Sequence, residues 1–155
     1  MTLRFGILTL SDRSARGERE DSSGPALARR IDGEGWLARR QLILPDEESS
    51  IRETLAQWAD SGEFDVILTT GGSGFAPRDV TPEATRAVIE REAPGLAEAM
   101  RSASLKITPH AMLSRSVVGI RRKTLIVNLP GSPTGSVANS EVRMPSLAHA
   151  VRVLQ

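Results

Sequence analysis

Residues 64–83 of the chain read FDVILTTGGSGFAPRDVTPE. The apolar run from Phe64 to Leu68 has the β-branched and bulky side chains of a buried strand, and a glycine pair ends it. Thr81 and Pro82 then predict a helix start, with Thr81 as the N-cap and Pro82 as the first helical residue. A strand, a loop that contains an acid, and a helix follow one another. This order is typical of the carboxyl edge of a sheet in an α/β protein.

The loop between the strand and the helix, residues 71–79, is called the glycine loop below, and it begins Gly71-Gly72-Ser73-Gly74. Glycines allow positive φ angles and a close approach of the backbone to a ligand, and consecutive exposed amides can surround phosphate oxygens. Asp79 adds a carboxylate where a phosphate-bound metal ion needs one. The glycine loop therefore predicts a phosphate-handling site. The alternative is a wide, glycine-rich turn that binds nothing.

The rest of the chain alternates between apolar runs typical of strands and amphipathic segments typical of helices. We expect strands at 3–10, 36–44, 64–68, 116–120 and 124–129. We expect helices at 25–31, from a Ser50 cap to near Gly62, and at 81–92, 94–102 and 145–154, with a short helical turn at 108–115 and a long polar loop at 11–25. Residues 121–123 form a basic hairpin turn between the last two strands, which is either a solvated turn or a phosphate contact.

This alternation predicts an α/β three-layer sandwich, in which helices flank a mostly parallel sheet that carries one antiparallel hairpin at its edge. The chain has 155 residues, of which 39% are hydrophobic. We therefore expect residues 1–155 to form one domain with a single core.

The composition argues against several classes of function. A net charge of +1 gives no reason to expect nucleic acid or a membrane as a partner, and no run approaches the ~18 apolar residues of a membrane span. The absence of cysteine excludes disulfides and thiolate chemistry and suits a reducing compartment, so we expect a soluble cytoplasmic protein. His110 and His149 lack metal-ligand spacing, and the sequence holds no Walker loop, dinucleotide fingerprint or Gly-x-Ser-x-Gly elbow.

Polar residues follow several of the expected strands. Ser11 and Asp12 follow the first, Asp46 follows the second, and residues 128–132 end the last. If these strands are parallel, their carboxyl ends meet at one edge, where Asp46 and Asp79 are able to share one divalent cation. Paired acids beside a phosphate cradle are typical of metal-assisted phosphoryl or nucleotidyl transfer. The alternative for each acid is a carboxylate at a turn or a helix end.

Five separated motifs together resemble the molybdenum-cofactor biosynthesis domain of the Mog and MoaB type, which also forms the G domain of gephyrin. They are Ser11-Asp12 with Gly17 and Asp21-x-Ser23-Gly24, Pro45-Asp46, Thr70 to Gly74, Arg78 to Glu83, and Leu129 to Pro133. Two departures affect the loops: Ser73 stands where many members have threonine, and Thr134-Gly135 follows the last motif in place of basic or small residues.

The resemblance implies a molybdopterin adenylyltransferase that uses ATP and Mg²⁺, with Asp46 and Asp79 as catalytic and metal-binding residues. It implies ligand contacts from Ser11, Asp12, Gly71, Gly72, Ser73, Gly74, Thr81, Pro130, Gly131 and Ser132. It also implies a homotrimer and a molybdenum-insertion partner protein. The alternatives are a molybdopterin-binding protein without turnover and a metal-insertion or partner-docking domain. The sequence leaves open the Mog or MoaB branch and which loop binds adenine and which binds the pterin.

Overall fold

The computed structural model describes the backbone of residues 1–155 and the side chains of all of them except 142–144. In chain order the elements are β1 (Arg4–Leu10), α1 (Asp12–Ala15), α2 (Ser23–Gly33), β2 (Leu37–Leu44), α3 (Glu48–Asp60), β3 (Val66–Thr70), α4 (Thr81–Val88), β4 (Arg91–Glu92), α5 (Pro94–Leu105), the 3₁₀ helix η1 (Pro109–Leu113), β5 (Val118–Arg121), β6 (Thr124–Leu129) and α6 (Pro133–Leu154).

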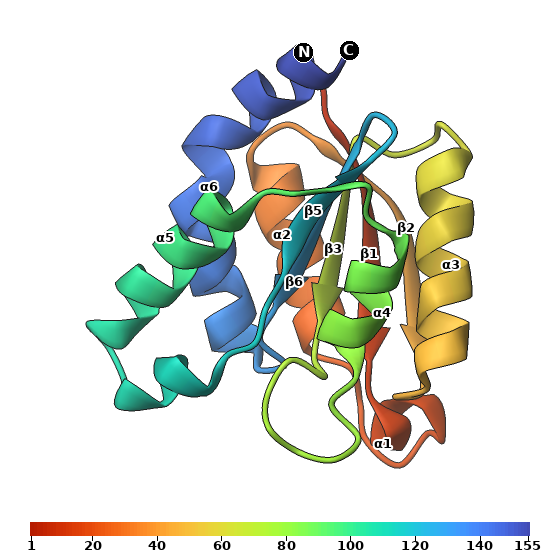
Figure 1. The fold of residues 1–155 in the computed structure, drawn as a ribbon, viewed down its shortest axis with the longest axis vertical. Helices are drawn as coiled ribbons and strands as arrows, with labels where there is room; N and C mark the ends of the chain where they lie inside the picture. Colours follow the sequence, from red (N-terminus) through yellow and green to blue (C-terminus); the bar gives the residue numbers. More distant parts are fainter.

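The strands form one six-stranded sheet in the order β2-β1-β3-β6-β5-β4. Strands β2, β1, β3 and β6 run parallel, whereas β5 pairs with β6 and β4 in antiparallel fashion. The expected α/β architecture, with a mostly parallel sheet and an antiparallel hairpin at the edge, is confirmed. The two chain ends lie at the end of the molecule opposite the glycine loop (Figure 1).

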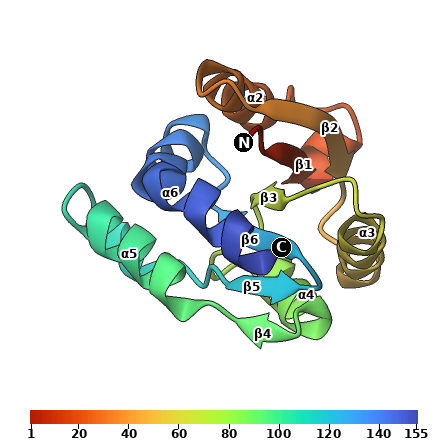
Figure 2. The same cartoon turned by 90° about the horizontal axis from the view of Figure 1, so that it is seen from above.

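Helices cover both faces of the sheet, so the molecule has three layers (Figure 2). Helices α2, α5 and α6 pack on one face, and α3 and α4 pack on the other. Strand β1 serves both layers because successive side chains point to opposite faces: Phe5 and Ile7 join the first core, and Leu8 and Leu10 join the second. Between Phe5 and Ile7, Gly6 leaves the space that the ring of Trp58 fills.

Helix α6 begins twelve residues before the predicted Pro145, so that prediction is wrong. Its N-cap is Ser132, whose side chain accepts a hydrogen bond from the backbone amide of Gly135, and Pro145 lies inside the helix. The first half of α6 buries Ser136 and Ser140 rather than large apolar side chains. This buried polar face carries none of the apolar periodicity on which helix prediction relies.

The expected helix at 81–92 is also too long. Helix α4 ends at Val88 because the backbone turns extended at Ile89, and the segment that follows pairs with β5. The amide of Glu90 donates to the carbonyl of Ile120, and the amide of Ala93 donates to that of Val118. Residues 91–92 are therefore strand β4, a short strand that no apolar pattern in the sequence indicates.

Smaller shifts occur at other boundaries. Strand β3 lies two residues later than expected. Thr69 and Thr70 continue it because they pair with Asn128 and Leu129 of β6. Helix α3 starts at Glu48 rather than after a Ser50 cap, and α2 starts two residues before Pro25. Part of the expected polar loop forms the short helix α1, and α5 continues to Leu105.

Candidate functional site

The carboxyl ends of β1, β2, β3 and β6 meet at one edge of the sheet, where α1 and the glycine loop also lie (Figure 1). Two cavities open there, of about 350 and 580 Å³. Both are lined by Gly72, Asp79, Gly131 and Ser132, so they adjoin across the glycine loop and the loop after β6. The sequence prediction that these segments gather at one edge therefore holds in the structure.

The smaller cavity is lined by Asp46, and the larger one extends along α5 and η1. The side chain of Arg101 lines the larger cavity and donates a hydrogen bond to the carbonyl of Ser116 at 3.0 Å. Ser11 lines the smaller cavity, whereas Ser73, Gly74 and Pro130 line the larger one.

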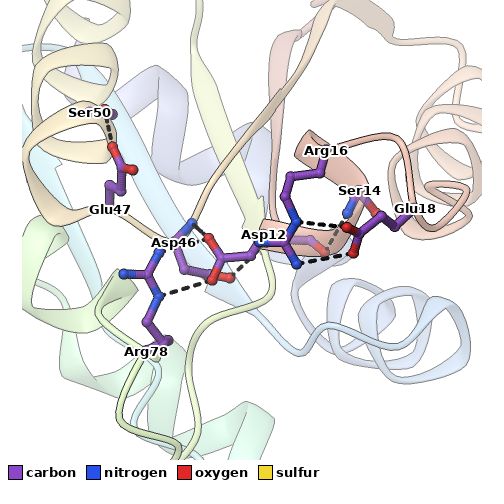
Figure 3. Close-up of polar contacts among 9 residues, drawn as sticks. Asp12, Ser14, Arg16, Glu18, Asp46, Glu47, Ser50 and Arg78 are labelled. Atoms are coloured by element: carbon purple, nitrogen blue, oxygen red, sulfur yellow. Dashed lines mark hydrogen bonds and ion pairs between the residues drawn. The ribbon is translucent and has the colours of Figure 1, made fainter.

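Asp12 and Asp46 hold each other in place through their backbones (Figure 3). The amide of Asp12 donates to Asp46 Oδ2 at 3.0 Å, and the amide of Asp46 donates to Asp12 Oδ1 at 2.9 Å. Arg78, from the glycine loop, donates to both carboxylate oxygens of Asp12, at 2.8 and 2.9 Å. The carboxylate of Asp12 therefore accepts hydrogen bonds from Asp46 and Arg78 and fixes their positions. Asp12, which was expected to contact the ligand, lines neither cavity.

These contacts move the two acids in opposite directions. The hydrogen bonds from Arg78 and from the amide of Asp46 lower the pKa of the Asp12 carboxyl from its ordinary 3.8 to about 2. Burial raises the pKa of the Asp46 carboxyl, and the charges of Asp12 and Asp79 raise it further, against the hydrogen bond from the Asp12 amide. The ionised form of Asp46 is thus destabilised by its surroundings, and a bound cation would stabilise it.

Asp46 Oδ1 is the one side-chain oxygen or nitrogen, within the part of the chain whose side chains are described, that is buried without a hydrogen-bond partner. A buried polar atom without a partner costs about 1–3 kcal/mol. A methyl group added at Gly72 would lie 3.0 Å from this oxygen, and one added at Gly74 would lie 3.0 Å from Asp79 Oδ2. Glycine at these positions therefore keeps a side chain from pressing against each carboxylate.

The glycine loop begins with two residues at positive φ, 101° for Gly71 and 67° for Gly72. The amide of Gly71 donates to the carbonyl of Leu129 at 3.2 Å, so it extends the pairing of β3 with β6 and is not available to a phosphate. In the part of the structure that is described, the amides of Gly72, Ser73 and Gly74 donate to no protein acceptor. Of the four amides predicted to bind phosphate oxygens, those of Gly72, Ser73 and Gly74 are therefore the ones available to a ligand.

Thr81 lies beneath the glycine loop rather than in a cavity. It is fully buried, and its hydroxyl donates to the carbonyl of Gly71 at 3.0 Å. Thr81 was predicted as the N-cap of α4, but Val80 occupies that position and Thr81 is the first helical residue. In the described structure the N-terminus of α4 has no side-chain cap hydrogen bond. Its role in the structure is to hold the turn at Gly71 rather than to face a ligand.

The loop of residues 130–132 is held by hydroxyl groups from three other elements. Thr70 donates to the carbonyl of Pro130 at 2.6 Å, Ser136 donates to the same oxygen, and Ser23 donates to the carbonyl of Gly131 at 2.7 Å. Ser132 then caps the 22-residue helix α6. The N-terminus of this helix points its partial positive charge toward the cavities, which favours an anionic ligand.

Asp79 stands at the far end of the glycine loop and lines both cavities. Its Oδ2 accepts the amide of Ala76 at 3.0 Å, and its own amide donates to the carbonyl of Ala76 at 2.9 Å. Arg115, which sequence reasoning did not single out, donates to the carbonyl of Asp79. No sequence signal pointed to Arg115, because its contacts with the glycine loop are made to main-chain oxygens that every residue carries.

A magnesium ion fits the donor set of this edge. Mg²⁺ is usually held by one or two carboxylates and otherwise by phosphate oxygens and water. Asp46 and Asp79 supply two carboxylates in one cavity, and no described residue gives Asp46 Oδ1 a hydrogen bond. No group of three or more potential metal-ligating side chains occurs among the described residues, so any such ion would depend on the substrate and water for further ligands.

The basic hairpin turn lies at the other end of β6, and Arg121 and Arg122 both pair with Asp60 at 2.9 Å. The turn is thus used for a structural ion pair rather than for the candidate site. Among the described residues, no helix has the length and apolar content that crossing a membrane requires.

Three known proteins are similar to the chain over nearly its whole length. It is 44% identical over 155 residues to the molybdenum cofactor synthesis protein cinnamon of Drosophila melanogaster, a match that covers 99% of the chain and 26% of cinnamon. It is 40% identical over 156 residues to a molybdopterin adenylyltransferase of Helicobacter pylori, covering 99% of the chain and 88% of that protein. A crystal structure of the molybdopterin biosynthesis enzyme MoaB from Thermus thermophilus has a TM-score of 0.93 and 48% identity, covering 99% of the chain and 96% of that structure.

The chain thus spans about a quarter of cinnamon and most of the other two proteins. A family model described as a probable molybdopterin binding domain matches residues 6–149, which include the carboxylates, the glycine loop and the loop after β6. The chain belongs to this molybdopterin-binding family, of the Mog and MoaB type.

Proposed function

We propose that the chain is a molybdopterin adenylyltransferase that activates molybdopterin with ATP in molybdenum cofactor biosynthesis. The observation that carries the proposal is a cavity lined by the half-buried Asp46, whose Oδ1 is buried without a hydrogen-bond partner among the described residues. The glycine loop also lines this cavity, and its amides at Gly72 to Gly74 donate to no acceptor in the described part of the protein. Carboxylates for a cation and free amides for phosphate oxygens are the two elements that nucleotidyl transfer needs. Relatives named for this activity support the proposal.

In the proposed reaction, an oxygen of the terminal phosphate of molybdopterin forms a bond to the α-phosphorus of ATP. The bond from that phosphorus to the oxygen bridging the α- and β-phosphates breaks, and pyrophosphate leaves with the electron pair. The products are adenylylated molybdopterin and pyrophosphate, so no oxidant, reductant or further reactant is required.

Each part of the site has a role that its surroundings support. Asp46 and Asp79 would hold Mg²⁺, which when bound neutralises charge on the triphosphate. The amides of Gly72 to Gly74 and the N-terminus of α6 would position phosphate oxygens. Because catalysis of this kind consists mostly of positioning and charge stabilisation, none of these groups has to move a proton.

The proposal extends to the surroundings of the enzyme. We expect a cytoplasmic homotrimer, since ATP is its co-substrate and the family resemblance implies three subunits, and a molybdenum-insertion protein that accepts the adenylylated product. Size-exclusion chromatography with light scattering measures the first expectation directly. A monomer at micromolar concentration would rule out the trimer without affecting the proposed chemistry.

The experiment that tests the activity incubates purified protein with molybdopterin, MgCl₂ and ATP and follows pyrophosphate together with the adenylylated product. Asp46→Asn and Asp79→Asn remove one carboxylate each, and Asp60→Asn is the matched control because its carboxylate pairs with arginines away from the site. We expect about 10²–10³-fold slower turnover in the first two variants, the loss typical of removing one electrostatic contact to a transition state, and normal turnover in the control.

Unchanged turnover in both Asp46→Asn and Asp79→Asn would refute the assigned roles. Tight binding of molybdopterin by the unmodified protein without any product would instead favour the alternative, a binding protein of the same fold that performs no transfer. Calorimetric titration with molybdopterin separates this outcome from a failure to bind at all.

A further inference from the structure

Arg115 lies between η1 and β5, outside every segment that the sequence analysis assigned to the site. We infer that Arg115 is a positioning residue, which fixes the conformation of the glycine loop and thereby aims Asp79 and the loop amides at the cavities. The inference rests on the proposed function only for its catalytic consequence. The structural claim, that Arg115 sets the order of the loop, stands independently of the reaction.

Arg115 contacts the glycine loop at three successive points. Its backbone amide donates to the carbonyl of Ser73 at 2.8 Å, its Nε donates to the carbonyl of Gly74 at 2.8 Å, and its Nη2 donates to the carbonyl of Asp79 at 2.7 Å. The two ends of the loop segment that carries Asp79 are therefore bonded to one guanidinium group. If the guanidinium group moves, the backbone at Gly74 and at Asp79 has to move with it.

The guanidinium group is itself fixed by a carboxylate. Glu83, in the first turn of α4, accepts hydrogen bonds from Nη1 at 2.7 Å and from Nη2 at 3.2 Å. The side chain of Arg115 is about one-third exposed, so this ion pair alone adds little stability. Its effect is geometric, because a planar guanidinium with both ends engaged has one orientation left.

The rest of the loop has few other attachments. In the described part of the structure, the hydrogen bonds that join residues 73–79 to other segments come from Arg115 on one side and from the Arg78–Asp12 pair on the other. The remaining bonds of this segment run between Ala76 and Asp79, within the loop. Arg115 is the attachment that reaches the main chain of Asp79 itself.

Arg115 bonds to the main chain of Asp79 and leaves its carboxylate facing the cavities. An arginine that paired with the carboxylate would neutralise the charge that a metal ion needs. Bonding through the carbonyl instead gives position without loss of charge. Lysine does not reproduce this arrangement, because a single ammonium group on a flexible stem lacks the rigid fork that reaches Gly74, Asp79 and Glu83 together.

The chain offers a matched control in Arg121. Arg121 also donates to a main-chain carbonyl, that of Val88, and also forms a two-point contact with a carboxylate, that of Asp60. Its side chain is 26% exposed, against 34% for Arg115. The two arginines have similar structural surroundings, but Arg121 lies at the opposite end of the sheet strands from the site.

The test compares Arg115→Gln, Arg115→Lys and Arg121→Gln with the unmodified protein in two assays. The first is hydrogen exchange of the amides of Ala76 and Asp79, which report opening of the loop because each is hydrogen-bonded within it. We expect about 10-fold faster exchange or more in Arg115→Gln, which corresponds to about 1.4 kcal/mol of lost protection, a smaller change in Arg115→Lys, and none in Arg121→Gln.

The second assay is pyrophosphate release with molybdopterin and Mg-ATP. We expect kcat to fall by up to about 10²-fold in Arg115→Gln, the effect of displacing a reacting group by about 1 Å, while Arg121→Gln keeps normal kcat. Arg115→Lys should lie between them, because it restores the charge but not the fork.

Unchanged loop exchange in both Arg115 variants overturns the inference, whatever the activity. Equal loop exchange in Arg121→Gln and Arg115→Gln also overturns it, because the effect would then be general destabilisation. If Arg115→Gln does not fold, Arg115→Lys decides, and wild-type exchange and kcat in that variant refute a need for the guanidinium. Absence of turnover in the unmodified protein refutes the proposed function and leaves the exchange assay to judge Arg115 alone.

Discussion

Replacing Gly72 with alanine tests whether the glycine loop is shaped to keep the space beside Asp46 open. The added methyl group would overlap Thr81 Oγ1 and lie 3.0 Å from Asp46 Oδ1, on a backbone with φ of 67°. Gly62 provides the control, since it has φ of 75° and nothing within 4 Å of an added methyl group. The two substitutions share the backbone strain and differ in the contact.

The left-handed backbone costs an alanine about 1–2 kcal/mol at either position. At Gly72 the methyl group also displaces Thr81, whose hydroxyl holds the carbonyl of Gly71, and forcing extra volume into packed surroundings costs about 1–3 kcal/mol more. We therefore expect Gly62→Ala to lower the free energy of unfolding by about 1–2 kcal/mol and Gly72→Ala by about 2–5 kcal/mol.

Urea denaturation at pH 7 and 25 °C measures both values, and the proposed activity gives a second readout. We expect Gly72→Ala to lose about 10²-fold or more of pyrophosphate release, because a methyl group then takes the space where a cation would meet Asp46, and Gly62→Ala to keep normal release. Equal destabilisation by the two substitutions would refute the steric argument. Near-normal turnover by a folded Gly72→Ala would show that the ligand does not approach Asp46 past Gly72.

Three further predictions concern the acids and α6. Arg78 and the Asp46 amide hold the pKa of the Asp12 carboxyl at about 2, so this pKa should rise toward 3.8 in Arg78→Gln, as measured by carboxyl NMR titration. The contribution of Asp12 to the free energy of unfolding is present above pH 3.8 and is lost as the pH falls through about 2. For Asp46 the pH dependence has the opposite sign, because its pKa is raised: its contribution to the free energy of unfolding is present below pH 3.8 and is lost as the pH rises. In urea titrations, Asp46→Asn should therefore become more stable relative to the unmodified protein as the pH rises from 4 to 7. A difference in unfolding free energy that stays constant over this range would contradict the prediction. Ser132→Ala should cost about 1 kcal/mol in the same assay because Ser132 caps α6, whereas Ser22→Ala should cost little because Ser22 makes no side-chain cap bond to α2.

The sheet was largely predictable because its central strands are continuous apolar runs. Strand β1 and strand β6 lie within one residue of their predicted bounds, and both are buried on two faces. Parallel strands place their carboxyl ends at one edge, so the sequence also located Asp46 and the glycine loop at a common site. The prediction needed only the order of elements and not the details of their packing.

The errors in the fold have a shared cause. Helix α6 was missed over its first half because its buried face there is made of Ser136, Asn139 and Ser140, whose hydrogen bonds replace apolar contacts. Strand β4 has two exposed residues and exists only because β5 lies beside it. Neither element carries a local apolar pattern, since each is stabilised by partners that are distant in sequence or polar.

In the candidate site, too, the residues with local sequence signals were predicted and the roles of those that make distant contacts were not. Residues that would perform chemistry, such as Asp46 and Asp79, were identified because a carboxylate is recognisable by its residue type and the order of the strands placed both acids at one edge of the sheet. The roles of the residues that hold them were not predicted, because these residues act on main-chain atoms. Asp12 was expected to contact the ligand, but it bonds to the amide of a residue 34 positions away. Arg115, which was not predicted at all, bonds to a carbonyl 41 positions away. Any residue offers such atoms, so no residue type marks the contact in the sequence. It follows that substitution of residues that only hold the loops should also lower the activity of this chain, although these residues touch no substrate. Arg115→Gln, which removes no predicted ligand, is the substitution that separates these two views.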